Sequence, residues 1–459
     1  MPAFSAKDLS KWCGGTWRPS EPSAINGVCT DTRSLKPASL YVALRGPRHD
    51  GHDFVPQALT LGAAAAVVTD AYAAAHPPSA PLLCVRDTLK ALGDIARGYR
   101  DALKAKIVAV TGSVGKTTVK EMIADVLARK GATTRSRGNW NNDIGLPLSM
   151  LAMEPGEEFG VFELGMNHPG ELAPLCDMLR PDWGVVTNVG PVHLEFFDSV
   201  EAIGKEKATV LQRLPADGTA VVSRDEPLFE LLRASARCRV LTTSLGGARA
   251  DYEARLGNHP GVFTVFERAG GETAEFEVPL PGEHVVRDAL FAVAVGRGHG
   301  VAWGEIAEAL RNYRPPPMRW TETLIGGVAV INDAYNANPM SMRAALKAFE
   351  ETPVEGGRWL VFGGMRELGA AERDEHLALG RDVAGGNWAG LVTVGKVGRL
   401  IADGAEAAGF AADRLFRCED HANAVEQLSQ RVVDGDAVLL KASRGEELEK
   451  VLEIWRQQA

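Results

Sequence analysis

The sequence has few cysteines and no long apolar run. Its six cysteines never form a C-x-x-C pair, and they lie at positions 13, 29, 84, 176, 238 and 418. This scatter favours isolated buried thiols in a reducing compartment. No segment reaches the length of a membrane-spanning helix, and the first residues lack the apolar core of a signal peptide. We therefore expect a cytoplasmic protein that is not inserted in a membrane.

Net positive charge is also missing. The chain carries 50 Lys and Arg residues against 59 Asp and Glu residues, for a formal charge of −9. Such a balance argues against nucleic acid or an anionic membrane as a partner, so an anionic substrate must be held by local positive sites. Internal repeats, low-complexity tracts and a G-x-G-x-x-G fingerprint are absent. We therefore infer no bound dinucleotide.

What the chain does have is the size and composition of a multidomain globular protein. Hydrophobic residues make up 45% and charged residues 24% of its 459 positions. At a prior of about 150 residues per domain, this length predicts about three domains, each able to bury its own core.

A phosphate-binding loop is the clearest motif. The strand-like run 107–111 leads into a glycine-bracketed loop, and apolar residues then recur at helical spacing after Lys116. Backbone N–H groups and a helix N-terminus hold phosphates in such loops, while Lys116 neutralises charge and Thr117 offers an oxygen to Mg²⁺. Val110 departs from the common G-x-x-x-x-G-K-[ST] pattern, and an ordinary strand–turn–helix is the alternative. The loop comprises Gly112, Ser113, Val114, Gly115, Lys116, Thr117 and Thr118.

The first 103 residues predict a small α/β unit. Two polar segments, 30–34 and 45–53, interrupt its expected strands (39–44, 64–69, 81–85) and helices (54–61, 89–103). Their donors suit a phosphate or a uracil edge, although solvated turns would have the same composition. The candidate substrate-binding residues are Thr32, Arg33, Ser34, Arg48, His49 and Asp50.

A second unit is expected over residues 104–314. The apolar run 159–163 ends in Glu163, which could reach Mg²⁺ directly or through water from a strand beside the phosphate loop. His193 follows the strand-like run 183–188, at the sheet edge where ligands collect. Alternating patterns at 262–266 and 274–278 predict an antiparallel hairpin, and helices are expected at 285–297 and 303–313.

The segment Arg314–Pro317 predicts a stiff linker, because three prolines cannot continue a helix. Regular βαβ alternation follows over 315–459 and predicts a doubly wound, mostly parallel sheet. Its strands are expected at 328–331, 359–362, 391–394 and 437–440, and its helices at 341–351, 373–384, 397–408, 421–432 and 446–457.

Several motifs together resemble the Mur ligases of peptidoglycan synthesis. They extend over most of the chain, from about residue 28 to residue 450, and the most specific are Asn-Asn-x-Ile-Gly and Tyr-Asn-Ala-Asn-Pro. The phosphate loop alone marks only a broader superfamily that includes folylpolyglutamate synthetases. The matching segments are Thr30–Arg33, Asp50–Phe54, Thr111–Thr117, Asn139–Gly145, Glu163–His168, Asp333–Pro339 and Lys441–Arg444.

The resemblance implies an α/β protein of three domains and an ATP-dependent, amide-forming ligase. The domains would be a UDP-substrate domain (1–103), a P-loop ATP-binding domain with a parallel sheet and a β excursion (104–314), and a Rossmann-like ligase domain (315–459). Within the family, the chain is most similar to members that add the terminal dipeptide. This similarity implies UDP-N-acetylmuramoyl-tripeptide and D-alanyl-D-alanine as substrates, an acyl-phosphate intermediate, and ATP and Mg²⁺ as cofactors. We expect a monomer.

Motif matches also imply residue roles. Lys116 and Thr117 would hold the β- and γ-phosphates and Mg²⁺, Glu163 and His193 would serve the metal sites, and Arg319 would lie near the γ-phosphate. Asp333 would lie near the ribose, and Asn336 and Asn338 beside the nucleotide. Lys207 matches the position that the family carbamylates, which would make it a metal ligand, with Lys205 as the alternative.

Two further segments suit the peptide substrates. Asn141 and Asn142 offer amide donors where a peptide arm could lie along the ATP domain. Lys441, Ser443 and Arg444 follow a predicted strand and could hold the dipeptide's carboxylate, although surface charge at a helix start is the alternative.

The chain departs from the family's pattern at three places. Val285 and Asp288 stand where Asn residues usually lie near the adenine, so we expect base recognition to be weaker or shifted, because a carboxylate cannot donate to a ring nitrogen. Gly364 and Ala442 replace a usual Asp and a usual Gly.

Other functions fit parts of the sequence. A P-loop switch or mechanical ATPase would hydrolyse ATP against a protein partner, but it gives no role to the polar segments of the first unit. The preceding Mur ligase, which adds a diamino acid, usually carries an Asp-Asn-Pro-Arg run in its third domain, and no such run occurs here.

Overall fold

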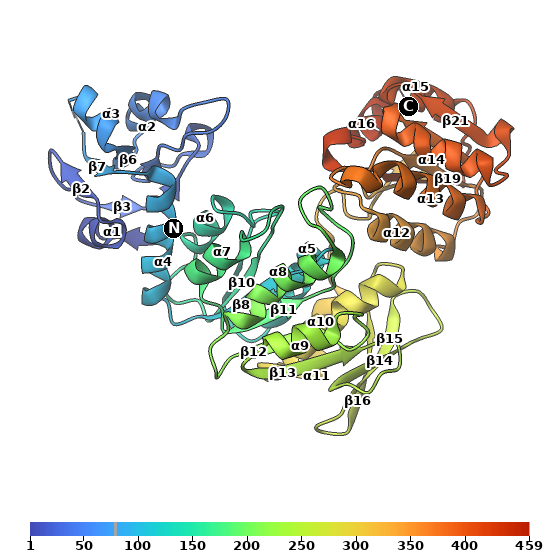
Figure 1. Cartoon of the computed structure of the whole chain (residues 1–459), viewed down its shortest axis with the longest axis horizontal. Coiled ribbons are helices and arrows are strands. Elements are labelled where there is room, and N and C mark those ends of the chain that lie inside the picture. Colours follow the sequence, from blue (N-terminus) through green and yellow to red (C-terminus); the bar gives the residue numbers. More distant parts are fainter. Residues whose placement is uncertain (78–79, 459) are drawn as a thin grey trace.

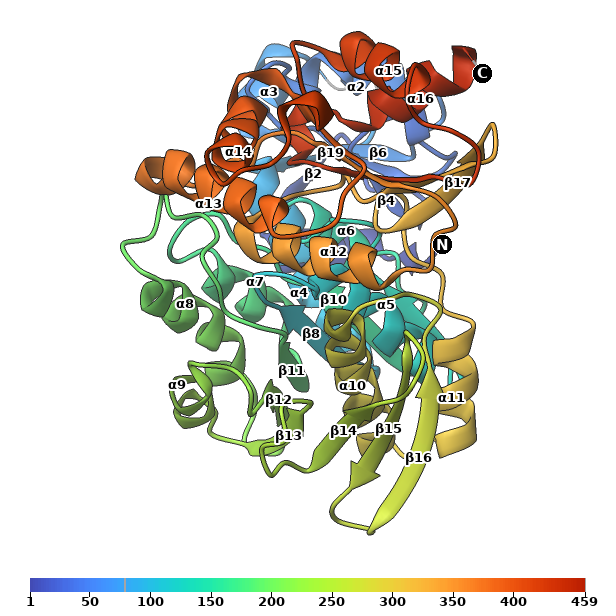
Figure 2. The same ribbon diagram turned by 90° about the vertical axis from the view of Figure 1, so that its right-hand side faces the viewer.

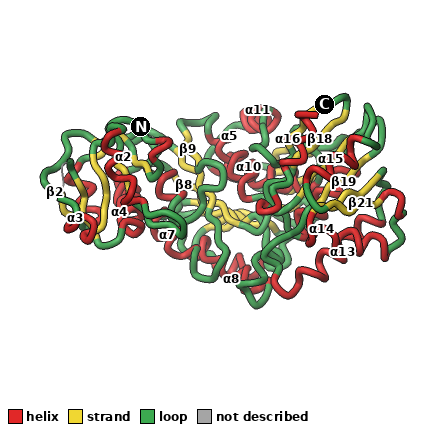
Figure 3. Tube along the Cα trace, turned by 90° about the horizontal axis from the view of Figure 1, so that it is seen from above, coloured by secondary structure: helices red, strands yellow, loops and turns green. Residues whose placement is uncertain are grey.

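Three α/β units follow one another along the chain, each built on its own sheet. We describe residues 1–77 and 80–458 of a computed structural model. The N-terminal and C-terminal units lie at opposite ends of the molecule, with the central unit between them (Figures 1 and 3). The predicted three-domain α/β fold is confirmed, while the exact domain boundaries stay a prediction.

The N-terminal unit has a sheet of order β2-β7-β6-β5-β4, parallel except for the antiparallel edge strand β2, and a separate β1–β3 ribbon. Both predicted polar segments form 3-10 turns, Thr32–Ser34 and Gly51–Phe54, capped by Asp31 and Asp50. The other elements are β1 Ala3–Phe4, α1 Ala6–Cys13, β2 Thr16–Arg18, β3 Ile25–Asn26, β4 Val28–Cys29, β5 Leu40–Val42, α2 Val55–Thr60, β6 Ala65–Thr69, α3 Asp70–Ala75, β7 Leu82–Val85 and α4 Thr88–Ala102.

The central unit has a sheet of order β16-β15-β14-β13-β12-β11-β8-β10-β9. The strands from β9 to β14 are parallel, and β14, β15 and β16 form an antiparallel excursion, so the predicted hairpin is confirmed. Its elements are β8 Lys106–Thr111, α5 Lys116–Leu127, β9 Thr133–Arg135, α6 Gly145–Met150, β10 Phe159–Glu163, α7 Leu172–Leu179, β11 Trp183–Val186, α8 Val200–Gln212, β12 Thr219–Ser223, α9 Phe229–Ser235, β13 Arg239–Ser244, β14 Tyr252–Leu256, β15 Val262–Glu267, β16 Glu272–Glu277, α10 Glu283–Gly298 and α11 Trp303–Arg311.

The C-terminal unit is doubly wound, as predicted. Its sheet has the order β17-β18-β22-β19-β20-β21, and only the edge strand β17 is antiparallel within this part of the described chain. Leu360 and Phe362 of β19 pack toward α12, α13 and α14, while Trp359 and Val361 pack toward α15 and α16. The elements are β17 Thr321–Ile325, β18 Val328–Asn332, α12 Pro339–Glu351, β19 Arg358–Phe362, α13 Glu372–Ala384, β20 Gly390–Val394, α14 Gly395–Ala407, β21 Leu415–Cys418, α15 His421–Ser429, β22 Ala437–Lys441 and α16 Glu449–Gln458.

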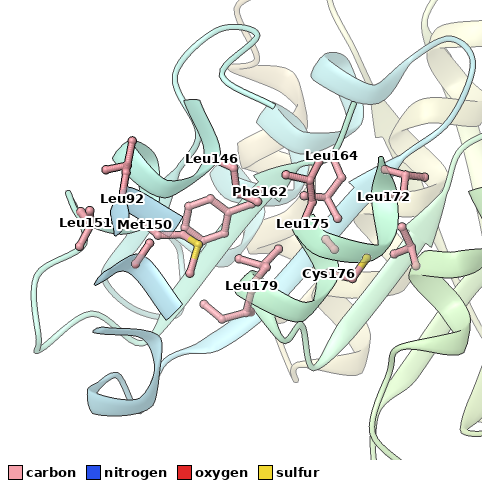
Figure 4. Packing of buried hydrophobic residues seen from close by; sticks show 14 of the residues in the cluster. Leu92, Leu146, Met150, Leu151, Phe162, Leu164, Leu172, Leu175, Cys176 and Leu179 are labelled. Carbon is pink, nitrogen blue, oxygen red and sulfur yellow. The ribbon is translucent and has the colours of Figure 1, made fainter. Parts of the chain in front are cut away.

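Helix α4 joins the N-terminal unit firmly to the central one. Its Leu92 lies with side chains of α6, β10 and α7 in one buried apolar cluster (Figure 4). The Tyr99 hydroxyl donates to the Met153 carbonyl at 2.7 Å, and Arg100 Nε donates to the Leu179 carbonyl at 3.0 Å. Burying one such apolar side chain stabilises the fold by roughly 1.5–3 kcal/mol, so this junction is not a loose linker.

Helix α12 forms the contact of the C-terminal unit with helix α10 of the central one. It lies on the side of its unit that faces α10 (Figures 1 and 2). Gly282, with φ of +99°, allows a close approach, because a Cβ there would lie 2.9 Å from the Cβ of Ala348 on α12. Lys347 and Glu283 form an ion pair of 2.8 Å across the same junction.

The cysteines and the longest helices can be compared with the sequence analysis. All six cysteines are unpaired in the described part of the chain. Among residues 1–77 and 80–458, no helix combines the length and the apolar character that crossing a bilayer requires.

Candidate functional site

A cavity of about 910 Å³ lies between the carboxyl ends of the central strands and the C-terminal unit. Both units contribute to its wall. The predicted site residues that line it are Ser113, Val114, Gly115, Lys116, Thr117, Thr118, Asn141, Asn142, Glu163, His193, Arg319, Asp333, Asn336, Asn338 and Lys441.

The phosphate loop runs from the end of β8 to the start of α5. Gly112 and Gly115 have φ of +155° and +83°, conformations that favour glycine. Lys116 Nζ donates to the Gly112 carbonyl at 2.9 Å, and burial lowers the pKa of this ammonium. Asn188, which the sequence analysis missed, accepts from the Val114 N–H at 2.9 Å and donates to its carbonyl at 2.9 Å. The loop is therefore held in shape by a residue two positions beyond the end of β11.

Glu163, Thr117, Asn141 and Arg319 meet at one point of the cavity. Glu163 is 2% exposed, and its two carboxylate oxygens accept from the Thr117 hydroxyl at 2.7 Å and the Asn141 amide at 2.8 Å. Arg319 Nη2 donates to Thr117 Oγ1 at 2.9 Å, and its guanidinium lies 4.2 Å from the Tyr335 ring centroid. A buried carboxylate beside a hydroxyl supplies the hard oxygen donors that Mg²⁺ prefers.

Lys207 and Lys205 differ sharply in environment. Lys207 on α8 is 2% exposed, and burial, followed by the charge of Lys116, holds the pKa of its ammonium well below its ordinary value. No residue in the described ranges forms a hydrogen bond or ion pair with it. Lys205 is exposed and pairs with Glu201 at 2.7 Å. Lys207 therefore lies in an environment that favours the neutral amine, the form that reacts with CO₂.

His193 contacts the C-terminal unit. Its Nδ1 lies 2.6 Å from Oε2 of Glu367, and this hydrogen bond is the main cause that lowers the pKa of Glu367. Both residues have positive φ, +54° and +62°. In this arrangement His193 thus joins two units, rather than contacting Glu163.

The loop that follows β18 is held by hydrogen bonds from Lys441 and from its own Asn338. Lys441 Nζ, on β22, donates to Asp333 Oδ2 at 2.5 Å and to the Asn336 carbonyl at 3.2 Å. Asn338 caps α12 by accepting from the Ser341 N–H at 2.9 Å. The residues predicted to bind the nucleotide therefore lie on a single loop, which these hydrogen bonds hold in place.

The segment 441–444 offers fewer groups for a substrate than we expected. Lys441 is 3% exposed and its ammonium is paired with Asp333, and Ser443 Oγ donates to the Ala337 carbonyl and accepts from the Arg366 N–H. Arg444 keeps an exposed guanidinium that pairs with Glu449. Lys441 and Ser443 therefore brace the neighbouring loops, and only Arg444 faces outward.

The N-terminal candidates Thr32, Arg33, Ser34, Arg48, His49 and Asp50 do not line the main cavity. Arg33 is exposed and pairs with Asp31 at 2.6 Å, and Arg48 and His49 are exposed. Asp50 borders a second cavity of about 440 Å³.

His52, which lies in the same motif, is a buried structural residue of the N-terminal unit. Its Nδ1 lies 2.6 Å from Asp50 Oδ1, and its Nε2 accepts from the Thr69 N–H at 3.0 Å. His52 therefore joins the Asp50 turn to the end of β6. Its bonds to Asp50, through side chain and backbone N–H, also hold the pKa of that carboxyl well below its ordinary value.

The departures from the family pattern have structural counterparts. Asp288 on α10 is 7% exposed and faces Gly115, since a Cβ at Gly115 would lie 2.5 Å from its Oδ1. Burial raises the pKa of Asp288 well above its ordinary value, and burial lowers the pKa of His284 to about 4. A Cβ at Gly364 would already lie 2.8 Å from Val397, so the larger side chain of an Asp would require a local shift.

Comparison with known proteins covers all three units. Family profiles match as "Mur ligase family, catalytic domain" over residues 24–100, "Mur ligase middle domain" over 110–296 and "Mur ligase, glutamate ligase domain" over 318–444. The UDP-N-acetylmuramoyl-tripeptide–D-alanyl-D-alanine ligase of Bacillus subtilis is 36% identical over 433 residues, 94% of this chain and 93% of that protein.

Solved structures are similar over the same extent. MurF from Acinetobacter baumannii superimposes with a TM-score of 0.88 at 28% identity, over 100% of this chain and 99% of that one. MurF from Thermotoga maritima, solved in complex with ADP, gives a TM-score of 0.81 at 27% identity, over 94% and 97%. The similarity extends from the N-terminal unit to the C-terminal unit.

Proposed function

Because the chain belongs to the Mur ligase family, we propose that it joins D-alanyl-D-alanine to UDP-N-acetylmuramoyl-tripeptide and converts ATP to ADP and phosphate. The observation that carries this proposal is 36% identity, over 94% of the chain, to a relative named for that reaction. The cavity supports it, since a phosphate loop, a buried carboxylate and an arginine from the next unit converge there. Its biological role would be cell-wall precursor synthesis, which serves cell shape and division.

The chemistry proceeds in two steps. A carboxylate is a poor electrophile, so its oxygen first attacks the γ-phosphorus of ATP, and the bond to the β-phosphate oxygen breaks to release ADP. The neutral amine of the dipeptide then attacks the acyl carbon, phosphate leaves with the bonding pair, and the amine loses a proton. Lys116, the N–H groups of the phosphate loop and Arg319 neutralise the charge that is transferred.

Thr117 and Glu163 would hold Mg²⁺, with His193 and a carbamylated Lys207 as further ligands. The hydroxyl and carboxylate oxygens beside the phosphate loop fit this ion. When bound, Mg²⁺ would neutralise phosphate charge. In the present arrangement His193 contacts Glu367, so its role as a ligand requires that hydrogen bond to be released.

Carbamylation would convert Lys207 into an oxygen ligand. The neutral amine attacks CO₂, a C–N bond forms, and loss of a proton leaves an anion with two carboxylate-like oxygens. Burial favours the neutral amine at Lys207, while Lys205 is exposed and paired with Glu201.

The matched pair Lys207→Gln and Lys205→Gln tests this assignment. We expect Lys207→Gln to lower kcat by about 100-fold or more and Lys205→Gln to leave it within about twofold. A ¹³C carbamate signal should appear with labelled bicarbonate in the parent protein and in Lys205→Gln only. The signal in Lys207→Gln would contradict the assignment.

Each unit has a proposed task. Residues 1–103 would hold the UDP end through Thr32, Arg33, Ser34, Arg48, His49 and Asp50, residues 104–314 would hold ATP, and residues 315–459 would close the site. Asp333, Asn336 and Asn338 would contact the nucleoside, and Asn142 the peptide arm. Arg444, rather than Lys441 or Ser443, would hold the dipeptide carboxylate, because the latter two are engaged within the protein. We also propose a monomer in the cytoplasm; the unpaired cysteines suit a reducing compartment.

One assay separates this function from its rivals. ATP-dependent phosphate release is measured with UDP-muramoyl dipeptide, UDP-muramoyl tripeptide and folate, each offered D-Ala-D-Ala, diaminopimelate or glutamate. We expect activity with tripeptide plus D-Ala-D-Ala. Activity only with dipeptide plus the diamino acid, or only with folate plus glutamate, would overturn the proposal. ATP hydrolysis without any carboxylate substrate would favour a P-loop switch or mechanical ATPase.

A further inference from the structure

Lys120 is a fully buried lysine one turn beyond Thr117 on α5. Its side chain is 0% exposed. A buried ammonium is costly unless it is paired and hydrogen-bonded, so its partners define what it does. Lys120 Nζ donates to the Ser136 carbonyl at 2.7 Å and the Gly138 carbonyl at 3.2 Å, and it pairs with Glu121 at 2.8 Å. Two of the three partners belong to the segment that follows β9.

That segment, residues 136–142, also forms hydrogen bonds with Glu163. Ser136 is 0% exposed, and its Oγ accepts from the Glu163 N–H at 3.1 Å. Asn141 donates from its amide to the Glu163 carboxylate at 2.8 Å, and its carbonyl accepts from the Gly165 N–H at 2.9 Å. The segment therefore holds both the backbone and the side chain of Glu163.

Helix α5 reaches the same carboxylate by a second route. Thr117 donates directly to the other carboxylate oxygen at 2.7 Å. Thr117 and Lys120 are three residues apart and so lie on one face of the helix. One face of α5 thus acts on Glu163 twice, directly through Thr117 and indirectly through Lys120 and the 136–142 segment.

We infer that Lys120 is a positioning residue of the ligase site, which holds segment 136–142 so that Ser136 and Asn141 orient Glu163 toward the metal–nucleotide complex. This inference rests on the proposed function, because it takes Glu163 as a metal ligand. An apolar side chain in place of Lys120 would leave the carbonyl of the buried Ser136 without this donor and would release the Gly138 carbonyl. The segment would then loosen while the phosphate loop stays intact.

The test compares Lys120→Met with Val126→Ala. Val126 is a fully buried residue of the same helix that faces Gly296 on α10, so its truncation perturbs α5 without touching segment 136–142. Calorimetry measures ADP affinity with and without Mg²⁺, and thermal unfolding measures stability. Neither measurement needs the peptide substrate. Ligation by the parent protein is measured separately, so failure of the proposed function remains distinguishable from failure of this inference.

We expect Lys120→Met to bind ADP without Mg²⁺ within about twofold of the parent, and to lose about tenfold or more of the Mg²⁺-dependent gain in affinity, with kcat reduced about 10- to 100-fold. Hydrogen exchange should accelerate at residues 136–142. Val126→Ala should keep the Mg²⁺-dependent gain and kcat even where its melting temperature falls as far. An unchanged Mg²⁺ response in folded Lys120→Met, or the same loss in Val126→Ala, would overturn the inference.

Ser136→Ala gives a second route if Lys120→Met does not fold. It removes only the oxygen that accepts from the Glu163 N–H. We expect a smaller loss of the Mg²⁺-dependent gain in affinity than in Lys120→Met. When Ser136→Ala is added to Asn141→Ala, the further loss should be smaller than the loss that Ser136→Ala causes in the parent, because both residues act on Glu163. A Ser136→Ala protein with the parent's Mg²⁺ response would overturn the inference.

Discussion

At the scale of single residues, the central unit contains charged groups whose protonation depends on burial. Lys116 and Lys207 have pKa values lowered by burial, and Asp288 has a raised pKa for the same reason. A bound nucleotide would bring negative charge to Lys116 and stabilise its ammonium form. Binding and protonation are therefore coupled at this wall of the cavity.

Lys116→Ala should remove most ligation and leave the fold intact. The lost phosphate contact acts in the transition state, and its removal should cost on the order of 3 kcal/mol, or about 100-fold in kcat/KM. Steady-state kinetics measure this loss, and circular dichroism checks folding. Near-normal turnover by a folded Lys116→Ala protein would contradict the site assignment.

His299 should make stability depend on pH. It packs 4.5 Å from Trp183 and 5.2 Å from Phe159, between ring centroids, and burial lowers its pKa to about 4. Unfolded histidine titrates near about 6.5, so between pH 6.5 and 4 the unfolded state binds more protons. The stability that comes from keeping His299 neutral is therefore complete above pH 6.5 and is lost as the pH falls toward 4.

His299→Phe keeps an aromatic ring in the same packing and removes the titration. Urea unfolding at pH 7 and pH 4.5 should show a smaller loss of stability in the variant, by up to about 3 kcal/mol. Equal losses in the two proteins would show that His299 is not held neutral in the folded state.

At the scale of elements, the start of α12 has two tasks. Asn338 caps the helix through the Ser341 N–H and lines the cavity. Pro339 at the first helical position suits the same start, because its fixed φ is already helical and its missing N–H leaves no unpaired donor. The wall of the cavity therefore includes a side chain that the helix needs in any case.

Asn338→Ala and Asn338→Ser separate these tasks. Loss of the cap in Asn338→Ala should lower stability by about 1 kcal/mol, whereas serine keeps the cap and most of that stability. If the amide contacts the nucleotide, Asn338→Ser should still lose ATP affinity, by roughly tenfold. Parent-like ATP affinity in a stable Asn338→Ser protein would limit Asn338 to capping.

At the scale of the whole molecule, the residues proposed to bind the substrates lie in two places. The phosphate loop lines the main cavity, while the candidate UDP residues belong to the N-terminal unit and lie outside that cavity. Arg319 already contacts Thr117 across the 314–317 linker, and His193 contacts Glu367. The central and C-terminal units are thus already in contact in this arrangement.

Binding of both large substrates should compact the molecule further. Small-angle scattering with an ATP analogue and UDP-muramoyl tripeptide should give a smaller radius of gyration than either ligand alone, because the C-terminal unit swings about residues 314–317. An unchanged radius, with both ligands shown to be bound, would mean that this arrangement is already the closed one.

Local patterns in the sequence were enough for much of the fold. The spacing around residues 107–127 predicted β8, the phosphate loop and α5, and the prolines at 315–317 marked the junction of two units. Backbone conformation at these places follows from neighbours a few residues away, so the sequence reveals it. Edge strands such as β9, β17 and β21 were missed, because short or polar strands depend on a neighbouring strand.

Only the tertiary structure decided which side chains meet. Burial distinguishes Lys207 from Lys205, although both lie on α8, and pairing turns Lys441 inward toward Asp333. Asn188 and Lys120 brace the site from positions that no motif marked. These roles depend on strand order and on contacts between residues far apart in the chain, which the spacing of residues along one segment does not encode.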